Sequence, residues 1–288
     1  MLAFFETWEV RVATSYALAG KVYLAGAGPG SAKLLTLRAM DVLQEADLVM
    51  HDDLVSADVL ACIPARTAVH NVGKRCGHKK TTQEEIHRRM IGAARGGQTV
   101  VRLKGGDPLI FGRTHEEIRA LRQAGIEFEI IPGITAAAAA AAGAQIPLTE
   151  RNSAEKLVFV SNHPSPEKMS RNWHTSVTQD ATMVFYMPGS DYSALITELA
   201  TSGLGERTPC LLVSHATRPE QRMIRTTLGA LGTAPGVAAP SLLIVGSAVA
   251  EARAEEWPAP ASSAEELGAS KVEEFSLGLH DTDKLAAR

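Results

Sequence analysis

With 288 residues, the chain is long enough for two medium-sized α/β domains, each able to bury a core of its own. Hydrophobic residues make up 45% of the sequence, charged residues make up 21%, and the net charge is -3. This is the balance of an ordinary globular protein, so overall charge gives no basis for a role at nucleic acid or at a membrane surface.

Cysteine content and the N-terminal segment favour the cytoplasm. Three scattered cysteines, Cys62, Cys76 and Cys210, do not suggest a disulfide framework. Charged residues interrupt the first 20 residues, which we therefore expect to be an extension rather than a signal peptide. The longest apolar run, at 134–144, is too short to span a bilayer. Because Cys76-Gly77-His78 lacks a second Cys/His cluster at ligand spacing, we expect no bound metal.

The first part of the chain alternates predicted strands with predicted helices. A short apolar run at 21–25 enters the glycine loop 26–30, and helical spacing follows over 34–46. Thr82 and Glu85 have the spacing of a capping box. Further strands are predicted at 47–51, 68–72, 100–103 and 128–131, and further helices at 82–95 and 115–124. This alternation predicts a parallel sheet built by right-handed crossovers.

An alanine-rich helix predicted at 134–144 leads into a second set of elements. These are strands at 156–161, 182–187, 210–214 and 242–245, a helix at 193–201 and an extended segment at 223–228. We therefore expect an N-terminal extension at 1–20, an N-terminal α/β domain at 21–133, a C-terminal α/β domain at 134–250 and a polar tail at 251–288.

Loops rich in glycine and charge follow the five predicted strands of the first domain. They are the loop 26–30, Asp52-Asp53, the loop 73–78, Gly105-Gly106-Asp107 and Pro132-Gly133. Because the carboxyl ends of parallel strands share one edge of the sheet, these loops together supply carboxylates, cations and exposed backbone at one place. The residues alone predict a binding cleft and leave its ligand open.

The first glycine loop is partly similar to a dinucleotide-binding fingerprint, with Asp52 near the position of a ribose-binding carboxylate. Two residues disagree with this interpretation. Ser31 replaces the third glycine, and Pro29 removes an amide donor from the loop. An NAD(P)-dependent oxidoreductase is therefore the less favoured alternative, and a simple tight turn is equally compatible with the loop.

Longer segments carry a resemblance to a known family. They are Gly26-Ala27-Gly28-Pro29-Gly30, Asp52-Asp53-Leu54-Val55-Ser56, Gly73-Lys74-Arg75-Cys76-Gly77-His78, Gln83-Glu84-Glu85-Ile86, the string from Arg102 to Arg113, Pro132-Gly133-Ile134-Thr135-Ala136, Ile146-Pro147-Leu148-Thr149 and Val184-Phe185-Tyr186-Met187. In this order they resemble the uroporphyrinogen-III C-methyltransferases, which belong to the tetrapyrrole methylases. The resemblance extends from about residue 21 to 250.

The resemblance implies a homodimer of subunits with two α/β domains, a parallel sheet in the first and a mixed sheet in the second. S-adenosylmethionine would lie in a cleft between the domains and leave as S-adenosylhomocysteine. Two methyl transfers, to C2 and C7 of uroporphyrinogen III, would give precorrin-2 for sirohaem, cobalamin or haem d1 synthesis. Methyl transfer from a sulfonium is an in-line displacement that depends on alignment, so no metal is required.

Carried over position by position, the resemblance implies that Asp52 is the proton acceptor and Lys74 the proton donor. Without the resemblance, Asp52 alone is more typical of an ordinary carboxylate in a strand-end turn. A substrate rich in carboxylates would explain cations that face the cleft, namely Arg75, Arg113 and Arg151. The implied contacts to S-adenosylmethionine are Pro29, Gly105, Gly106, Asp107, Ile110, Thr135, Ala136, Met187 and, in place of a usual glycine, Ala216.

The chain departs from the family pattern at several positions, three of which bear most on its function. Asp53 stands where an arginine is common, Glu150 where a histidine is usual, and Ala216 adds a methyl group in a cofactor loop. These departures keep two further alternatives open. One is a methylase that acts on another precorrin, and the other is a non-catalytic protein that binds S-adenosylmethionine or a tetrapyrrole.

Overall fold

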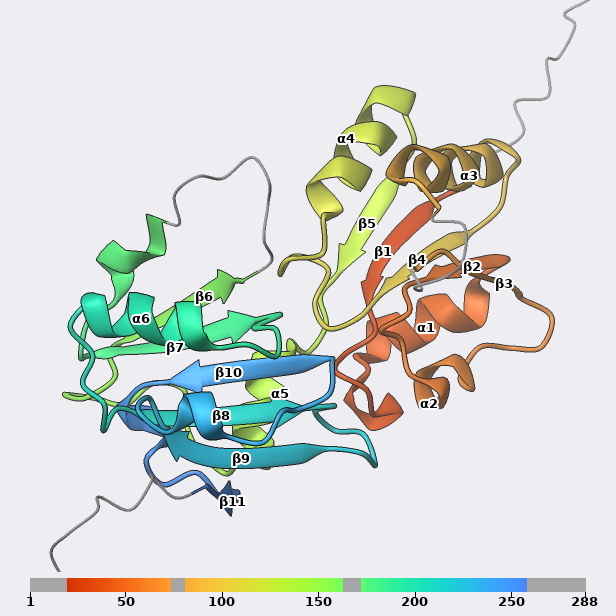
Figure 1. The fold of residues 1–288 in the computed structure, drawn as a ribbon. Helices are drawn as coiled ribbons and strands as arrows, with labels where there is room; N and C mark the ends of the chain where they lie inside the picture. Colours follow the sequence, from red (N-terminus) through yellow and green to blue (C-terminus); the bar gives the residue numbers. More distant parts are fainter. Residues whose placement is uncertain (1–19, 74–80, 163–171, 258–288) are drawn as a thin grey trace, which may run out of the picture.

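Two β-sheets, one in each half of the chain, organise the molecule into two lobes (Figure 1). The computed structural model describes residues 20–73, 81–162 and 172–257. In the first lobe the strands are β1 (Val22–Gly26), β2 (Leu48–His51), β3 (Ala68–Asn71), β4 (Val100–Lys104) and β5 (Phe128–Ile131), and the helices are η1 (Ala32–Leu34), α1 (Leu37–Glu45), α2 (Ala57–Leu60), α3 (Gln83–Arg95) and α4 (Thr114–Ala124).

The first sheet is parallel throughout, as the sequence predicts, and its strand order is β3-β2-β4-β1-β5. After β1 the chain crosses toward β2, and after β4 it crosses the opposite way toward β5. The sheet therefore has its topological switch point between the neighbouring strands β1 and β4. In doubly wound sheets, ligands bind outside the carboxyl ends of the strands at such a point.

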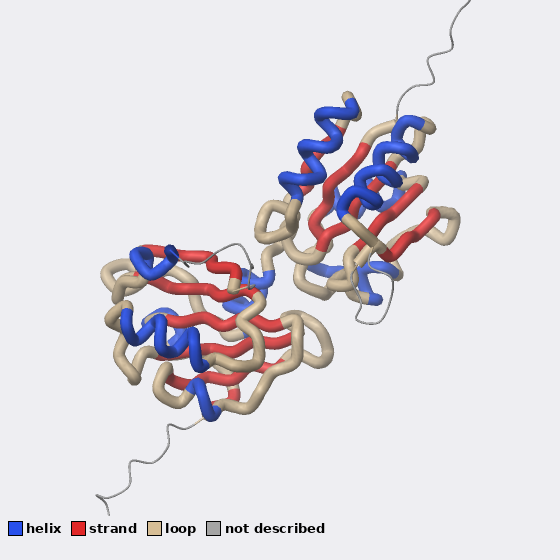
Figure 2. Tube along the Cα trace, turned by 45° about the horizontal axis from the view of Figure 1, so that its top comes forward, coloured by secondary structure: helices blue, strands red, loops and turns tan. Residues whose placement is uncertain are grey.

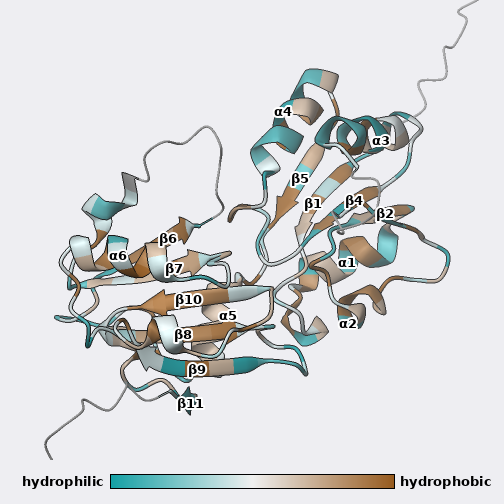
Figure 3. Cartoon of the chain, viewed as in Figure 1, coloured by the Kyte–Doolittle hydropathy of each residue, from teal (hydrophilic) through white to brown (hydrophobic). Residues whose placement is uncertain are grey.

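Both faces of the buried strands β1, β2 and β4 are covered, which explains why these strands are largely apolar. Tyr23 and Ala25 pack with α1 and α2 on one face. Val22 and Leu24 alternate with them and pack with α3 and α4 on the other. In Figure 3 the strands of the sheet are mainly brown, whereas teal covers much of α3 and α4. Fully burying a side chain such as Leu24 contributes about 1.5–3 kcal/mol.

Hydroxyl caps fix where the helices of the first lobe begin. The Thr82 hydroxyl accepts a hydrogen bond from the Glu85 amide over 3.2 Å, which confirms the predicted cap of α3. The helix predicted over 34–46 begins later than expected. Residues 32–34 form the short η1, and Thr36 then caps α1 with an extended backbone. The four-residue α2, capped by Ser56, is too short to show a helical period and was not predicted.

The second lobe contains a mixed sheet in the order β11-β9-β8-β10-β7-β6. The pairs β6–β7 and β9–β11 are parallel and the other pairs are antiparallel. Its elements are α5 (Ala136–Gly143), β6 (Lys156–Ser161), η2 (Asn172–Ser176), β7 (Ala181–Tyr186), α6 (Ser193–Thr201), β8 (Pro209–Ser214), β9 (Arg222–Thr227), η3 (Leu231–Thr233), β10 (Ser241–Val245), η4 (Ser247–Val249) and β11 (Glu255–Glu256).

The alanine-rich helix α5 covers one face of the mixed sheet and α6 covers the other. Ala137 and Ala140 are fully buried against Val184, Leu211 and Ile244. Leu195 of α6 belongs to the cluster on the opposite face. Side chains as small as alanine let the axis of α5 lie close to the strands. This helix follows β5 directly and so connects the two lobes.

The strand β11 lies within the tail predicted at 251–288 and pairs with β9, so the second sheet extends beyond residue 250. The division of the chain at residues 133 and 250 stays a prediction. Within the described residues, no helix has both the length and the apolar character needed to cross a membrane.

Loops from both lobes face each other where the lobes meet. In Figure 1 the arrowheads of β1 and β5 point toward the second lobe, and in Figure 2 the tan loops that follow the first sheet lie on the side of that lobe. The switch point of the first sheet is therefore directed at the junction.

Candidate active site

Two glycine loops meet at the switch point. Gly28 and Gly106 form an isolated antiparallel bridge, in which the Gly28 amide donates over 3.1 Å and the Gly106 amide over 2.8 Å. Both residues have a left-handed backbone, with φ of 68° and 69°, which glycine adopts without steric cost. The loops after β1 and β4 are thus one unit.

A third loop, after β5, packs against the same unit. We refer to the loops after β1, β4 and β5 as the switch-point loops. A Cβ atom on Gly26 would lie 2.6 Å from the Gly133 Cα, and one on Gly133 would lie 2.3 Å from the Gly106 carbonyl oxygen. The backbones approach so closely that only glycine fits at either position. Asp107 reinforces the contact, because its Oδ2 accepts a hydrogen bond from the Gly133 amide over 3.2 Å.

Asp52 lies at the end of β2, next to this unit. Its amide donates to the Leu103 carbonyl over 3.2 Å, and the Arg102 Nη2 donates to its Oδ1. The Asp52 side chain is 28% exposed, whereas that of Arg102 is 4% exposed. The carboxylate can therefore be reached from solvent while the cation that holds it cannot.

Arg102 continues into a buried chain of charges. Its Nε donates to Glu117 Oε1 over 2.9 Å, and Lys104 Nζ donates to Glu117 Oε2 over 2.8 Å. Glu117, on α4, is completely buried. Two cations thus neutralise two carboxylates, which is the condition for keeping such charges in the interior.

Burial affects the two cations of this chain differently. Desolvation, followed by the charge of Arg102, lowers the pKa of Lys104 below the usual range of a lysine. For Arg102, desolvation also favours the neutral form, but Asp52 and Glu117 outweigh it and its pKa is raised. Arg102 therefore remains a permanent positive charge beside Asp52.

Sequence reasoning missed Arg102, Lys104 and Glu117 as a group, although one signal was available. Arg102 and Lys104 stand two residues apart in a buried strand, so they must lie on one face of the sheet. That face carries α4. Two buried cations on the face of β4 that α4 covers require acidic partners, and α4 is the helix that can supply them.

Tyr186, at the end of β7, meets the first lobe from the other side of the junction. Its hydroxyl forms a hydrogen bond with the Thr135 hydroxyl. Its ring meets that of Phe111 edge to face, with 5.0 Å between the ring centroids. Burial raises the pKa of the Tyr186 hydroxyl. The next residue, Met187, is 48% exposed. The structure thus brings the predicted contact residues Thr135 and Met187 to the same junction.

Several non-glycine residues near the junction have a left-handed backbone. Phe111 and Met187 have φ of 51° and 54°, and Thr217, in the loop after β8, has φ of 67°. This conformation is uncommon for bulky residues and clusters at functional sites. Exposed apolar side chains accompany it at the strand ends, namely Leu54, Leu109, Phe111, Ile134 and Met187. We refer to these five exposed side chains, which follow β2, β4, β5 and β7, as the apolar rim.

The remaining predicted cofactor residues lie in these loops. Ala216 is 9% exposed and packs in one cluster with Ala136 and Tyr186. Pro29 is half-buried next to the Gly28–Gly106 bridge, and the amide of the half-buried Ile110 donates to the Asp107 carbonyl over 3.2 Å.

A family model described as Tetrapyrrole (Corrin/Porphyrin) Methylases matches residues 21–232. The chain belongs to the tetrapyrrole methylases. The parallel first sheet and mixed second sheet are the architecture of solved members of the family.

Relatives of this methylase include siroheme synthase 1 of Klebsiella pneumoniae, which is 41% identical over 254 residues, covering 88% of the chain and 54% of the relative. Siroheme synthase of Zymomonas mobilis is 44% identical over 228 residues, covering 79% of the chain and 48% of the relative. The chain therefore spans about half the length of these curated relatives.

Solved structures match the methylase over most of their own length. Uroporphyrin III C-methyl transferase from Thermus thermophilus is 36% identical with a TM-score of 0.69, covering 80% of this chain and 99% of that one. The same enzyme complexed with S-adenyl homocysteine is 35% identical with a TM-score of 0.69, covering 80% and 94%. Cobalt precorrin-4 methyltransferase is 28% identical with a TM-score of 0.71, covering 80% and 95%.

Not every predicted site residue of the methylase joins the junction. Arg113 is exposed and forms an ion pair with Glu116, with 2.7 Å between Arg113 Nε and Glu116 Oε1. Arg151 is exposed in the turn that Glu150 and Ala154 close, and no hydrogen bond or ion pair within the described ranges joins it to the other predicted residues. Lys74 and Arg75 lie outside the described residues.

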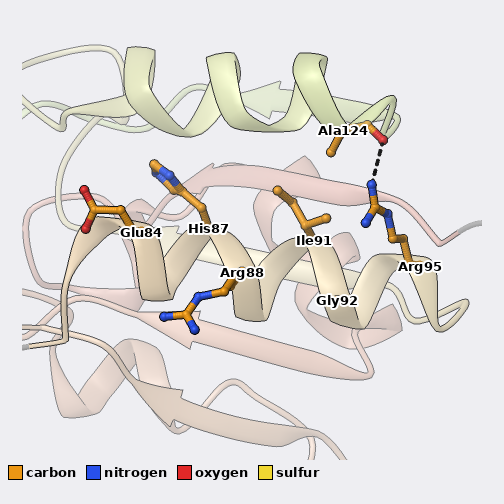
Figure 4. Close-up of a pocket in the computed structure, with 7 residues that line it drawn as sticks. All are labelled: Glu84, His87, Arg88, Ile91, Gly92, Arg95 and Ala124. Atoms are coloured by element: carbon orange, nitrogen blue, oxygen red, sulfur yellow. Dashed lines mark hydrogen bonds between the residues drawn. The ribbon is translucent and has the colours of Figure 1, made fainter.

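A separate open depression of about 380 Å³ lies between α3 and α4 (Figure 4). Its lining contains none of the predicted site residues and consists of Glu84, His87, Arg88, Ile91, Gly92, Arg95 and Ala124. No group of three or more histidine, cysteine or acidic side chains suited to a metal occurs in the part of the chain that the structure describes.

Proposed function

We propose that the chain is an S-adenosylmethionine-dependent C-methyltransferase that methylates uroporphyrinogen III at C2 and C7 to give precorrin-2. The observation that carries the proposal is the placement of Asp52. Its carboxylate is accessible, is held by the buried Arg102 and lies at the carboxyl end of β2, the neighbour of β4, whose following loop forms the Gly28–Gly106 bridge. Support also comes from the Thermus thermophilus enzyme, which is named a uroporphyrin III C-methyl transferase and is matched over 99% of its length.

The switch-point loops fit S-adenosylmethionine, which we propose as the cofactor. A Cβ atom on Gly106 would meet only the Ala136 amide nitrogen, at 3.9 Å, so the backbone there faces open space. Ala136 and Ala216 are small, and Met187 is exposed. These residues would hold the cofactor with Pro29, Gly105, Asp107, Ile110 and Thr135. When bound, it supplies an electrophilic methyl group on a sulfonium.

In this proposal Asp52 accepts the proton that leaves the macrocycle after a carbon is methylated. Its Oδ1 accepts the hydrogen bond from Arg102, which leaves Oδ2 to take the proton. Because Arg102 is charged and buried, it keeps the carboxylate oriented without competing for the substrate. Lys74 remains the proposed proton donor by resemblance.

The surroundings of Asp52 suit a flat, carboxylate-rich macrocycle. The exposed Leu54 and Phe111 lie on the apolar rim, which would contact its pyrrole rings. Arg113 would exchange its partner Glu116 for a substrate carboxylate, with Arg75 and Arg151 as further candidates. We also propose a homodimer and a cytoplasmic location, as the family resemblance and the cysteine usage suggest.

The test is anaerobic incubation of reduced uroporphyrinogen III with methyl-labelled S-adenosylmethionine. We expect label in the macrocycle, and none with Asp52→Asn at equal cofactor occupancy. Label in a later precorrin only would favour a relative with another substrate. Cofactor binding without transfer to any tetrapyrrole would favour the non-catalytic alternative.

A further inference from the structure

A pair of residues in the loop after β8 reaches across the junction to the first lobe. The Ser31 amide donates to Thr217 Oγ1 over 3.1 Å, and the Arg218 Nη2 donates to the Leu54 carbonyl oxygen. These contacts join positions 186 and 164 residues apart in the sequence. We refer to Thr217 and Arg218 as the clasp.

Gly30 makes room for the clasp. A Cβ atom there would lie 2.6 Å from the Arg218 Cγ and 3.2 Å from Thr217 Oγ1. The Gly30 carbonyl in turn accepts a hydrogen bond from Ser56, the cap of α2. The first glycine loop, α2 and the second lobe thus meet at one point, and the glycine permits that contact.

The clasp acts on the turn that carries Asp52. The Val55 amide donates to the Asp52 carbonyl over 3.1 Å, which closes a turn, and Leu54 is the residue just before Val55. Arg218 holds the carbonyl of that Leu54. On the other side a Cβ atom on Gly105 would come within 2.7 Å of the Leu54 Cβ, so Leu54 lies directly against the second glycine loop.

The clasp loop is itself braced within the second lobe. The Thr217 amide donates to Gln221 Oε1 over 2.6 Å, and the His215 amide donates to the Pro240 carbonyl over 2.9 Å. His215 and Thr217 both have positive φ, of 48° and 67°. Ala216, one of the proposed cofactor contacts, lies between them. Because these hydrogen bonds hold the loop to the second lobe, the clasp residues keep a defined position relative to the second sheet.

We propose that Arg218 is a positioning residue that docks the second lobe on the Asp52 turn. The distance between Asp52, the proposed base, and the loop that contains Ala216 is thereby fixed. The expected effect on catalysis rests on the proposed function, whereas the docking of the two lobes does not. Arg218 does not touch the reacting groups in this account. It acts through the Leu54 carbonyl and the turn that Asp52 begins.

The kinetic test compares Arg218→Met with Arg218→Lys. A turn displaced by about an ångström should lower kcat by about tenfold to a hundredfold. We expect this fall for Arg218→Met, partial recovery for Arg218→Lys, and an affinity for S-adenosylhomocysteine within about twofold of the original chain. Arg222→Met is the matched control, because Arg222 pairs with Glu255 and not with the first lobe. It should leave kcat unchanged.

A second test does not depend on activity. Hydrogen exchange at the amides of Val55 and Leu60, in the Asp52 turn and α2, should be faster in Arg218→Met than in the original chain. It should be unchanged in Arg222→Met, and exchange in β4 should be unchanged in both. Faster exchange with no methyl transfer even in the original chain would uphold the docking and overturn only the proposed function.

Gly30→Ala supplies an independent variant, because its added methyl displaces Arg218. Its effect on exchange should largely disappear in an Arg218→Ala background, since alanine lacks the Cγ with which the added methyl would collide. Unchanged exchange at Val55 in Arg218→Met, or fully additive effects of Gly30→Ala, would overturn the proposal.

Discussion

Arg102 donates from Nε to Glu117 Oε1 over 2.9 Å, and the same guanidinium reaches Asp52 through Nη2. One buried cation therefore joins the interior of α4 to the accessible edge of the sheet. The strand supplies the cation and the helix supplies its counter-charge. The position of Asp52 thus depends on Arg102, 50 residues further along the chain, and through Arg102 on Glu117 of α4.

Asp52→Asn should abolish methyl transfer and leave cofactor affinity close to that of the original chain, because the amide keeps the shape but cannot accept the proton. Single-turnover transfer and calorimetric binding of S-adenosylhomocysteine measure the two properties. Asp180→Asn, which alters an exposed pair with Lys156, is the control and should change neither. Normal turnover in Asp52→Asn would remove Asp52 from the mechanism.

Glu117→Gln should destabilise the fold by about 3–5 kcal/mol, because it leaves buried charge uncompensated. Adding Lys104→Met should recover part of that loss, since Lys104 is then no longer a buried cation without a partner. Urea unfolding of the two single variants and the double variant measures the coupling free energy between the residues. Strictly additive losses would show that Lys104 and Glu117 do not stabilise each other.

Gly133→Ala should prevent the three switch-point loops from packing, because the added Cβ would meet the Gly106 carbonyl at 2.3 Å. We expect lower stability and lost binding of S-adenosylhomocysteine. Gly92→Ala, in α3, is the matched control, because nothing lies within 4 Å of its added Cβ. The Gly92→Ala substitution should stabilise α3 by up to about 1 kcal/mol and leave binding of S-adenosylhomocysteine intact. Thermal unfolding and calorimetry distinguish the two variants, and equal behaviour would contradict the predicted close contact.

Glu129 should contribute a pH-dependent part of the stability. The hydrogen bond from Arg38 is the main cause that lowers the pKa of the Glu129 carboxyl, and Lys21 assists it. Because the folded-state pKa is below that of the unfolded chain, this stabilisation is present at neutral pH and is lost as pH falls through the folded-state pKa.

Urea unfolding of the original chain and of Glu129→Gln at a series of pH values measures this contribution. The difference between the two chains should be largest near neutrality and should shrink below about pH 4. A difference that stays constant down to pH 3 would contradict the assignment.

The strands, and the loops that follow them, could be predicted because their signals are local. Gly105 and Gly106 end an apolar strand, and Gly106 forms a backbone bridge with Gly28 in the loop that follows. The start of α1 could not be fixed from spacing alone, because Ser31 and Thr36 both cap and the structure uses each in turn.

Contacts between distant segments could not be predicted in the same way. The pairing of Arg102 with Glu117 requires knowing which helix covers β4, and the contact of Arg218 with Leu54 requires the relative placement of the two lobes. Neither pair has a periodic pattern. Family resemblance supplied the proposed roles of Asp52 and Met187, but not the residues that hold them in place.

The most direct test of the proposed activity is the mass of the tetrapyrrole product after anaerobic incubation of uroporphyrinogen III with S-adenosylmethionine. The account predicts a product that carries two added methyl groups, with labelled carbons at C2 and C7. Unmodified substrate recovered from a chain that is folded and binds S-adenosylhomocysteine would contradict it.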